Sequence, residues 1–415
     1  MAALSVFNDT PPAFPGEQLR IAADFAQDTD HNKVNLGSEE YCDEDNQQWV
    51  LPVVRKVQQH IANDPTLNHD HLPEAGLPEF TRSAVSMALG KDSIAILQNR
   101  AAGVQAIGGT GALFIGAKFL HRWYDNSSSS TAIYVASHAY EGCQEIFRNA
   151  GFENIHPYHY WDNEKASLAT AEMLEDLQNA PRHSIVVLDI DSSTGTNPST
   201  EVWEQIAIIL KRRDMFPFFR LTAQGLVSGD LENDAKPLRH FVAEGFQLFC
   251  AQSFSRNFGL YDERVGNLTI VMKDNDTLLR VRSEVEKIVR VVWSSPPMMG
   301  SRIVTAVLNN PALYAEWREN LKVMVERIML IRDKLKERLR LLSTPGSWEH
   351  ITNQAGMYCF TGFSSARINY LIKKKHVYLM ENGQINICKV NSKNLKYVTE
   401  AIHEAVTTDL QDCSQ

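Results

Sequence analysis

The chain has 415 residues, of which 44% are hydrophobic and 22% charged, and a formal net charge of −9. This length exceeds what one hydrophobic core usually serves, so we expect one large and one smaller domain. The ordinary composition excludes a disordered or fibrous chain. The acidic balance gives no electrostatic reason to bind nucleic acid or an anionic membrane face.

The sequence carries no recognisable targeting or membrane signal. No stretch of about 18 apolar residues occurs, and residues 1–18 have neither a basic nor an apolar signal region. The six cysteines form no CxxC pair, and no histidine stands at zinc-ligand spacing. We therefore expect reduced thiols, no metal site, no membrane span and a cytoplasmic location.

A glycine-rich turn opens a predicted helix over residues 108–124 (GGTGALFIGAKFLHRWY), in which apolar residues recur at helical spacing. Free backbone N–H groups at such a helix start can bind an anion. A glycine-rich entry also solves a tight turn without any ligand. On this segment alone, the tight turn is the stronger interpretation.

Short apolar runs alternate with helical stretches from residue 131 onward. Five runs read as buried strands: TAIYVAS (131–137), SIVVLDI (184–190), FPFFRL (216–221), FQLFCAQS (246–253) and GNLTIVM (266–272). This alternation predicts an α/β fold with a mostly parallel sheet and crossover helices. Such sheets bind ligands beyond the carboxyl ends of their strands, so candidate site residues fall within 137–141, 191–197, 220–225 and 253–264.

The last quarter of the chain has a different organisation. Residues 312–343 predict one long amphipathic helix, and residues 350–392 predict a few short strands and a helix. We expect a large domain of residues 45–320. We expect a small domain formed by residues 1–44 together with residues 321–415.

Several segments, in their order along the chain, resemble the cytosolic aspartate aminotransferase family over nearly its whole length. They include KVNLG, WVLPVV, GGTGAL, FCAQSFSRNFGLYDERVGNLT, WSSPP, GMYCFTG and HEAVT. The resemblance implies a PLP-transferase fold of type I, whose large domain has a mostly parallel sheet sandwiched by helices. It also implies a homodimer that binds pyridoxal phosphate and exchanges the amino group between L-aspartate and 2-oxoglutarate. The implied ligands are thus small dicarboxylic amino acids and keto acids.

The residues that hold the cofactor phosphate in this family are present. The resemblance places the helix start on Gly109 and Thr110, a serine on Ser253 and an arginine on Arg264. A helix dipole, a hydroxyl and a guanidinium suit a dianion, so the phosphate site becomes the stronger interpretation. Arg290 matches the arginine that crosses the dimer interface to bind the distal carboxylate of the substrate. A surface ion pair is an equally good interpretation of Arg290.

The residues of the family's chemistry are replaced. The position of the Schiff-base lysine is Arg256, in SFSRNFG, and the aspartate that protonates the pyridine nitrogen is replaced by Arg220. The chemistry needs a primary amine, whereas a guanidinium stays protonated to about pH 12. The tyrosine that bonds the ring phenolate is replaced by Ala223. We therefore expect no covalent attachment of pyridoxal phosphate and leave non-covalent binding open.

Five further family positions also differ. At the cofactor, the ring-stacking position is Tyr140, the asparagine position is Ser192 and a phosphate-binding tyrosine is replaced by His71. At the substrate, Gln384 replaces the arginine for the α-carboxylate, and Glu39 replaces a flexible glycine. A carboxylate at position 39 would repel a carboxylate substrate if it faces the site, whereas an isolated surface glutamate usually faces solvent.

Three hypotheses follow. The first is a catalytically impaired or inactive relative that still folds, dimerises and binds phosphate-bearing anions near Arg220, Arg256 and Arg264; buried cations need such an anion or an acid such as Asp191. The second is a rearranged enzyme that still converts aspartate or glutamate, with a replacement base such as His71. The third is a non-catalytic partner or scaffold that pairs with an active aminotransferase.

Overall fold

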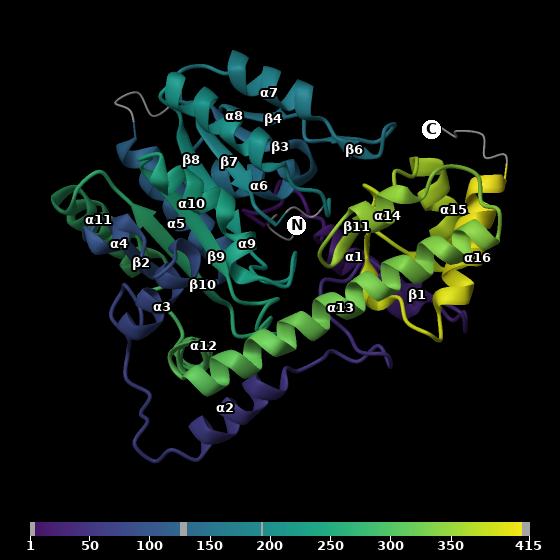
Figure 1. Cartoon of the computed structure of the whole chain (residues 1–415), viewed down its shortest axis with the longest axis horizontal. Helices are drawn as coiled ribbons and strands as arrows, with labels where there is room; N and C mark the ends of the chain where they lie inside the picture. The colour runs from purple at the N-terminus through teal and green to yellow at the C-terminus, as the bar shows by residue number, and fades with distance from the viewer. Residues whose placement is uncertain (1–4, 125–130, 192–193, 409–415) are drawn as a thin grey trace.

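The structure is a computed structural model that describes residues 5–124, 131–191 and 194–408, apart from the side chains of residues 140 and 141. Figure 1 shows a helix-covered sheet on one side and the C-terminal elements on the other, bridged by one long helix. None of the helices in the described ranges combines the length and the apolar composition that a membrane span requires.

Seven strands form the central sheet, in the order β2-β10-β9-β8-β7-β3-β4. Their bounds are β2 (Ala101–Ile107), β10 (Val265–Val271), β9 (Leu248–Ser253), β8 (Phe216–Leu221), β7 (Ile185–Asp189), β3 (Ile133–Ala136) and β4 (Ile155–Tyr158). The strands from β9 to β4 pair in parallel, whereas β10 runs antiparallel to both β9 and β2. The mostly parallel α/β sheet is therefore confirmed, and all five predicted runs contain strands.

Helices cover both faces of this sheet, because successive strand residues point to opposite sides. On one face Val187 and Phe218 pack with α5 (Gly108–Trp123), α6 (Tyr140–Ala150) and α11 (Asn275–Val292). On the other face Val186 and Phe219 pack with α3 (Pro78–Leu89), α7 (Thr170–Asn179), α8 (Thr200–Arg212) and α10 (Lys236–Ala243). This two-sided burial explains why the predicted strands are almost continuously apolar.

Helix α13 (Pro311–Leu341) joins the sheet to the C-terminal elements. Its 31 residues span about 46 Å, at the usual rise of an α-helix. At the end near the sheet, Trp317 is buried, stacks on Phe258 at 4.5 Å and donates a hydrogen bond to the Asn257 carbonyl. At the other end, fully buried Arg332 donates to the carbonyls of Ile351, Gly356 and Tyr358.

Short elements complete the fold. Around the C-terminal half of α13 lie α1 (Glu17–Gln27), β1 (Val34–Asn35), α14 (Glu349–Asn353), β11 (Tyr358–Phe360), α15 (Ser365–Lys375), β12 (Val377–Tyr378), β13 (Gln384–Asn386) and α16 (Leu395–Thr407). The others are α2 (Pro52–Ala62), α4 (Ile94–Leu97), β5 (Trp161–Asp162), β6 (Ser167–Leu168), α9 (Leu231–Asp234), α12 (Met299–Asn309) and two 3-10 helices, η1 (Ser137–Ala139) and η2 (Ile387–Lys389). Strand β1 pairs in parallel with β12, and β11 pairs antiparallel with β13.

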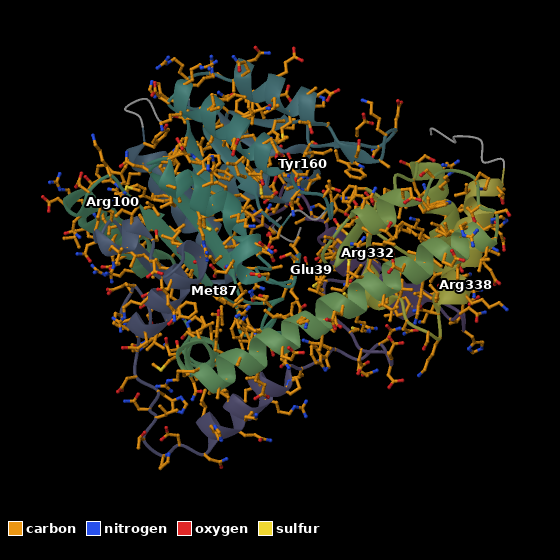
Figure 2. The ribbon with its side chains drawn as sticks, in the orientation of Figure 1. Glu39, Met87, Arg100, Tyr160, Arg332 and Arg338 are labelled. Carbon is orange, nitrogen blue, oxygen red and sulfur yellow. The ribbon has the colours of Figure 1, made fainter. Side chains whose placement is uncertain are left out.

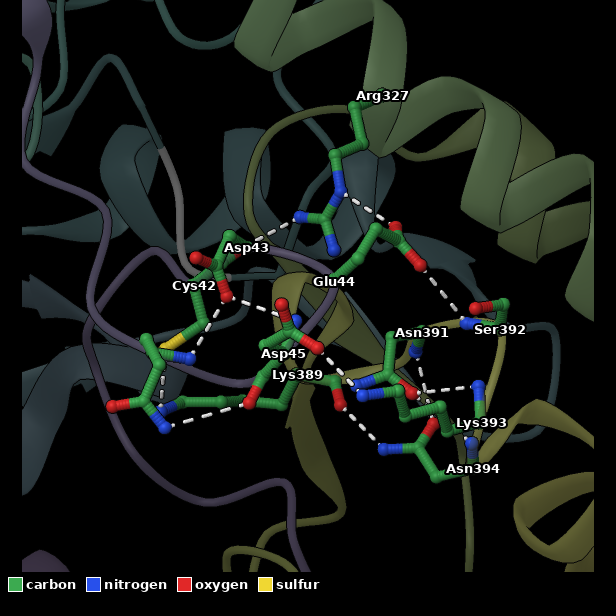
Figure 3. Close-up of polar contacts among 11 residues, drawn as sticks. Cys42, Asp43, Glu44, Asp45, Arg327, Lys389, Asn391, Ser392, Lys393 and Asn394 are labelled. Carbon is green, nitrogen blue, oxygen red and sulfur yellow. Dashed lines mark hydrogen bonds and ion pairs between the residues drawn. The ribbon is translucent and has the colours of Figure 1, made fainter.

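An acidic turn near the N-terminus is tied to α13 and to the residues that precede α16 (Figure 3). The Glu44 carboxylate accepts hydrogen bonds from Arg327 Nε at 3.0 Å and from the backbone N–H of Ser392 at 3.1 Å. The Ser392 N–H and then Arg327 hold the pKa of Glu44 below its usual value. Lys393 donates to Asp45 at 2.5 Å. Segments about 350 positions apart in the chain are therefore joined here by charge-assisted hydrogen bonds.

Candidate functional site

The carboxyl end of β2 leads directly into the start of α5, and glycine is needed at this turn. Gly108 has a φ of +67°, which favours glycine, and its N–H donates to the Arg264 carbonyl at 2.7 Å. A Cβ at position 108 would lie 2.8 Å from Arg264 Nη2. The turn thus brings the N-terminal end of α5 against Arg264. The exposed N–H groups of the first helical turn then favour an anion beside this arginine.

A cavity of about 180 Å³ lies at this end of the sheet. Three arginines that the sequence places far apart, Arg220, Arg256 and Arg264, all line it. The other lining residues are Glu39, Gly109, Thr110, Leu113, Ile146, Thr222, Ala251, Ser253, Ser255 and Tyr261. Cationic side chains, hydroxyl groups and a helix N-terminus together form the chemistry of an oxyanion site.

Arg220 is held by a carboxylate behind the cavity. It stands at the end of β8, in register with Asp189 of β7, and Arg220 Nη1 lies 2.9 Å from Asp189 Oδ1. Asp189 also lies 3.3 Å from His138 Nε2. Burial opposes the charged form of Asp189, but Arg220 and His138 together outweigh burial and hold the pKa of this carboxyl below its usual range. Asp189 does not line the cavity itself, but its ion pair orients the Arg220 side chain, which does.

Arg256 has no carboxylate in direct contact among the described residues. Its Nη1 donates to Thr222 Oγ1 at 2.9 Å, and its guanidinium lies over the ring of Tyr358, 5.0 Å from the ring centre. The Tyr358 hydroxyl donates in turn to the Glu39 carbonyl at 3.3 Å. Burial opposes the charge of Arg256, but Tyr358, Glu39, Asp191 and Tyr261 together more than compensate and raise its pKa. The side chain therefore remains a cation in the cavity wall.

Asp191 accepts hydrogen bonds from three donors on the neighbouring loop. These are the N–H and hydroxyl of Thr222, at 2.6 and 3.2 Å, and the N–H of Ala223. Burial raises the pKa of Asp191 to about 7, with Asp189 adding to the effect and Arg256 opposing it. Asp191 is therefore a carboxyl that changes charge near neutral pH beside Arg256.

Not every candidate residue from the sequence reaches this cavity. Glu39 lines it, accepts from Gln18 Nε2 at 2.8 Å and lies near the centre of the molecule in Figure 2. Ala223 is buried and contributes its N–H to Asp191, and Gln384 lies on β13, paired with Phe360.

Two more candidates lie outside the cavity, and two cannot be placed. Arg290, on α11, forms an ion pair with Glu74 at 2.8 Å, and His71 is exposed on the segment before α3. Neither is a lining residue in the single chain. Ser192 and the side chain of Tyr140 lie outside the described residues.

Reasoning from the sequence missed several residues of the site. Asp189 falls inside the predicted strand SIVVLDI, where a carboxylate before the last residue was the only available signal. Thr222 and Tyr261 fall in segments named as candidates, but neither was singled out. Ser255 lies one residue before Arg256 and donates its N–H to Ser253 Oγ at 3.3 Å. The contacts between these segments, rather than their residue types, reveal them.

The chain belongs to the class I and II aminotransferase family, whose model matches residues 31–402. It is 52% identical to cytoplasmic aspartate aminotransferase of Gallus gallus, over 98% of this chain and 99% of that protein. It is 41% identical to a Bos taurus protein named "Putative aspartate aminotransferase, cytoplasmic 2", over 98% of each chain.

Among solved structures, the aromatic-amino-acid aminotransferase of Burkholderia pseudomallei is similar, with a TM-score of 0.93 and 32% identity. The match covers 97% of this chain and 100% of that one, which is covalently bound to pyridoxal phosphate. The fold of this chain is therefore that of the pyridoxal-phosphate aminotransferases, as its sequence predicts.

The cavity fits only part of the family's cofactor. The start of α5, Ser253 and Arg264 suit a phosphate dianion. Within the described residues no lysine lines the cavity, and the charged lining residues besides Arg264 are Arg220, Arg256 and Glu39. A guanidinium does not form an imine with an aldehyde at neutral pH. The residues present thus suit a bound anion better than a covalently held aldehyde.

Proposed function

We propose that this chain is an aspartate-aminotransferase-like protein that has lost the covalent chemistry of its family and binds small anions non-covalently. The single observation that carries this proposal is the presence of Arg256, without any lysine, in the wall of the arginine-lined cavity. Arg256 stands where the resemblance places the Schiff-base lysine. An arginine offers neither a free amine nor a general base.

Other replacements support the same proposal. Arg220, at the position of the family's pyridine-binding aspartate, is engaged with Asp189, so a cation stands where the family has an anion. Gln384 lacks the charge that grips an α-carboxylate, and Glu39 lines the cavity with a carboxylate. Removing one member of a catalytic unit commonly costs several powers of ten in rate, and the losses within a unit are not additive.

An absorbance spectrum with added pyridoxal phosphate, recorded before and after aspartate, tests this proposal. We expect no band of covalently attached cofactor and no change with aspartate. An Arg256→Lys variant asks whether the pocket still accepts the cofactor once an amine is restored. Arg318→Lys, at an exposed position outside the cavity, is the matched control. A band in the unmodified chain that changes with aspartate would refute the proposal.

A rearranged, active enzyme is the second candidate, and Asp191 is the observation that favours it. A carboxyl whose pKa is about 7 can accept a proton at neutral pH, which a general base requires. Neither Asp191 nor His71 lines the cavity, but Asp191 accepts a hydrogen bond from the lining residue Thr222, whereas His71 is exposed, so Asp191 is the better candidate base. Turnover of aspartate or glutamate that Asp191→Asn abolishes would support this candidate.

Assembly, domain division and location complete the proposal. We propose a homodimer, or a dimer with an active relative. Arg290 and His71 stand at positions that bind substrate and phosphate in the family, yet neither lines the cavity of the single chain. A second subunit would bring such residues to the cavity. Mass photometry of the purified chain, alone and mixed with the relative, separates these possibilities. We also propose the two domains expected from the sequence, divided near residues 44 and 320, and a cytoplasmic location, in keeping with the names of the relatives.

A further inference from the structure

Arg220 and Arg256 form a second group of anion-binding side chains in the cavity. They are distinct from the start of α5, Ser253 and Arg264, which suit a phosphate. Arg220 and Arg256 come from two neighbouring strand ends and line the same wall as Thr222. Each uses few of its five N–H donors within the described residues: Arg220 contacts Asp189 through Nη1, and Arg256 contacts Thr222 through Nη1. Donors therefore remain on both guanidinium groups for a ligand.

The two arginines differ in their direct contacts. Asp189 compensates Arg220, whereas Arg256 contacts a hydroxyl and an aromatic ring and touches no carboxylate among the described residues. Glu39 lines the cavity, but its carboxylate accepts from Gln18, and the Arg264 side chain donates to the Tyr261 carbonyl at 3.4 Å. Arg256 stays a cation in the cavity wall, and most of its N–H donors have no carboxylate acceptor within the described residues, so an anionic ligand group can accept from them.

We infer that the cavity binds one compact ligand with two anionic groups: a phosphate at the α5 start and Arg264, and a second oxyanion, carboxylate or phosphate, at Arg220 and Arg256. This inference rests on the proposed function, because a covalently attached cofactor ring would occupy the second position. The volume of about 180 Å³ is below that of a typical pocket for a drug-sized ligand, so the two groups are joined by a short linker.

Isothermal titration with four probes tests this inference. Inorganic phosphate carries one group, 2-phosphoglycolate a phosphate and a carboxylate, methylenediphosphonate two phosphonates, and succinate two carboxylates. We expect 2-phosphoglycolate or methylenediphosphonate to bind at least about tenfold more tightly than phosphate, as one additional charge-assisted contact allows. Which of the two binds more tightly identifies the second group, and we expect succinate to bind most weakly.

Variants separate the two positions. Arg256→Gln should remove the tenfold advantage and leave phosphate affinity unchanged, whereas Arg264→Gln should weaken all phosphate-bearing probes. Arg220→Gln is made together with Asp189→Asn, so that no buried carboxylate is left unpaired if the single change prevents folding. Arg318→Gln, at an exposed position outside the cavity, is the control for charge alone.

Equal affinity for phosphate and for both two-group phosphorus probes would overturn the inference, as would an equal loss for all probes in Arg256→Gln. Failure of every probe to bind would also overturn it. The outcome of the absorbance test with pyridoxal phosphate is independent of the titrations. A covalent band in the unmodified chain would refute the loss of covalent chemistry, whatever the titrations give. Absence of that band with equal affinities would refute only the second anion position.

Discussion

Replacing Asp191 by asparagine changes the charge of a partly buried carboxyl while keeping its shape. Its two backbone donors, the N–H groups of Thr222 and Ala223, bond to one carboxylate oxygen, which the amide oxygen can replace. The new NH₂ group then faces the Thr222 hydroxyl oxygen, which can accept a hydrogen bond. The variant therefore isolates the effect of ionisation from the effect of losing contacts.

The raised pKa of Asp191 makes the folded state less stable as pH increases. The folded protein holds this proton up to about pH 7, whereas the unfolded chain releases it near 3.8. Stability from protonated Asp191 is thus complete below pH 3.8 and is lost as pH rises towards about 7. At about 1.4 kcal/mol per pH unit, the full effect is about 4 kcal/mol, of which about 2–3 kcal/mol falls between pH 5 and pH 8.

Urea unfolding of both chains at pH 5, 6, 7 and 8 measures this effect. We expect the unmodified chain to lose stability relative to Asp191→Asn by about 2–3 kcal/mol across this range. Carboxyls that do not interact with Asp191 titrate equally in both chains, and Asp189 has a pKa below its usual range, so the difference between the chains from pH 5 to pH 8 reports Asp191. Asp92→Asn, at an exposed carboxylate, is the control. A difference between Asp191→Asn and the unmodified chain that stays constant with pH would refute burial as the cause of the shift.

Arg332→Met should lower the free energy of unfolding by about 3 kcal/mol or more, because three carbonyls lose a buried donor. The control Arg340→Met, at an exposed position, should change it by less than about 0.5 kcal/mol. Similar urea midpoints for these two variants would contradict this role. Trp317→Ala should cost about 3–5 kcal/mol in the same assay, since it empties a fully buried site, and a loss below about 1 kcal/mol would be inconsistent with the packing. Gly108→Ala should weaken phosphate binding about tenfold in isothermal titration by displacing Arg264, and unchanged affinity would exclude the close approach.

The sequence was most informative where one element determines its own burial. The apolar runs predicted β3, β7, β8, β9 and β10, and the helical spacing predicted α5 and α13. Strand β2 was not predicted, because AAGVQAI is rich in alanine and glycine, which have low strand propensity. The direction of β10 was also beyond local pattern, since an antiparallel and a parallel strand that are both buried read alike.

The sequence predicted the arginines of the site, but their partners became known only from the contacts in the structure. Matching segments named Arg220, Arg256 and Arg264, and the structure places all three at one cavity. Their partners follow from strand register: Asp189 faces Arg220 because β7 and β8 are aligned at that residue. The shifted pKa of Asp191 depends on how deeply the loop is packed, which no residue pattern encodes.

The hydrogen bonds between the acidic turn at residues 43–45 and residues 392–393 have a consequence for synthesis of the chain. During translation from the N-terminus, the turn leaves the ribosome long before Ser392 and Lys393 exist. The same is true of β1, whose strand partner β12 begins at Val377. Residues 34–45 therefore lack these partners until the last tenth of the chain has been synthesised. We expect a nascent chain stalled before residue 377 to leave this segment open to proteases.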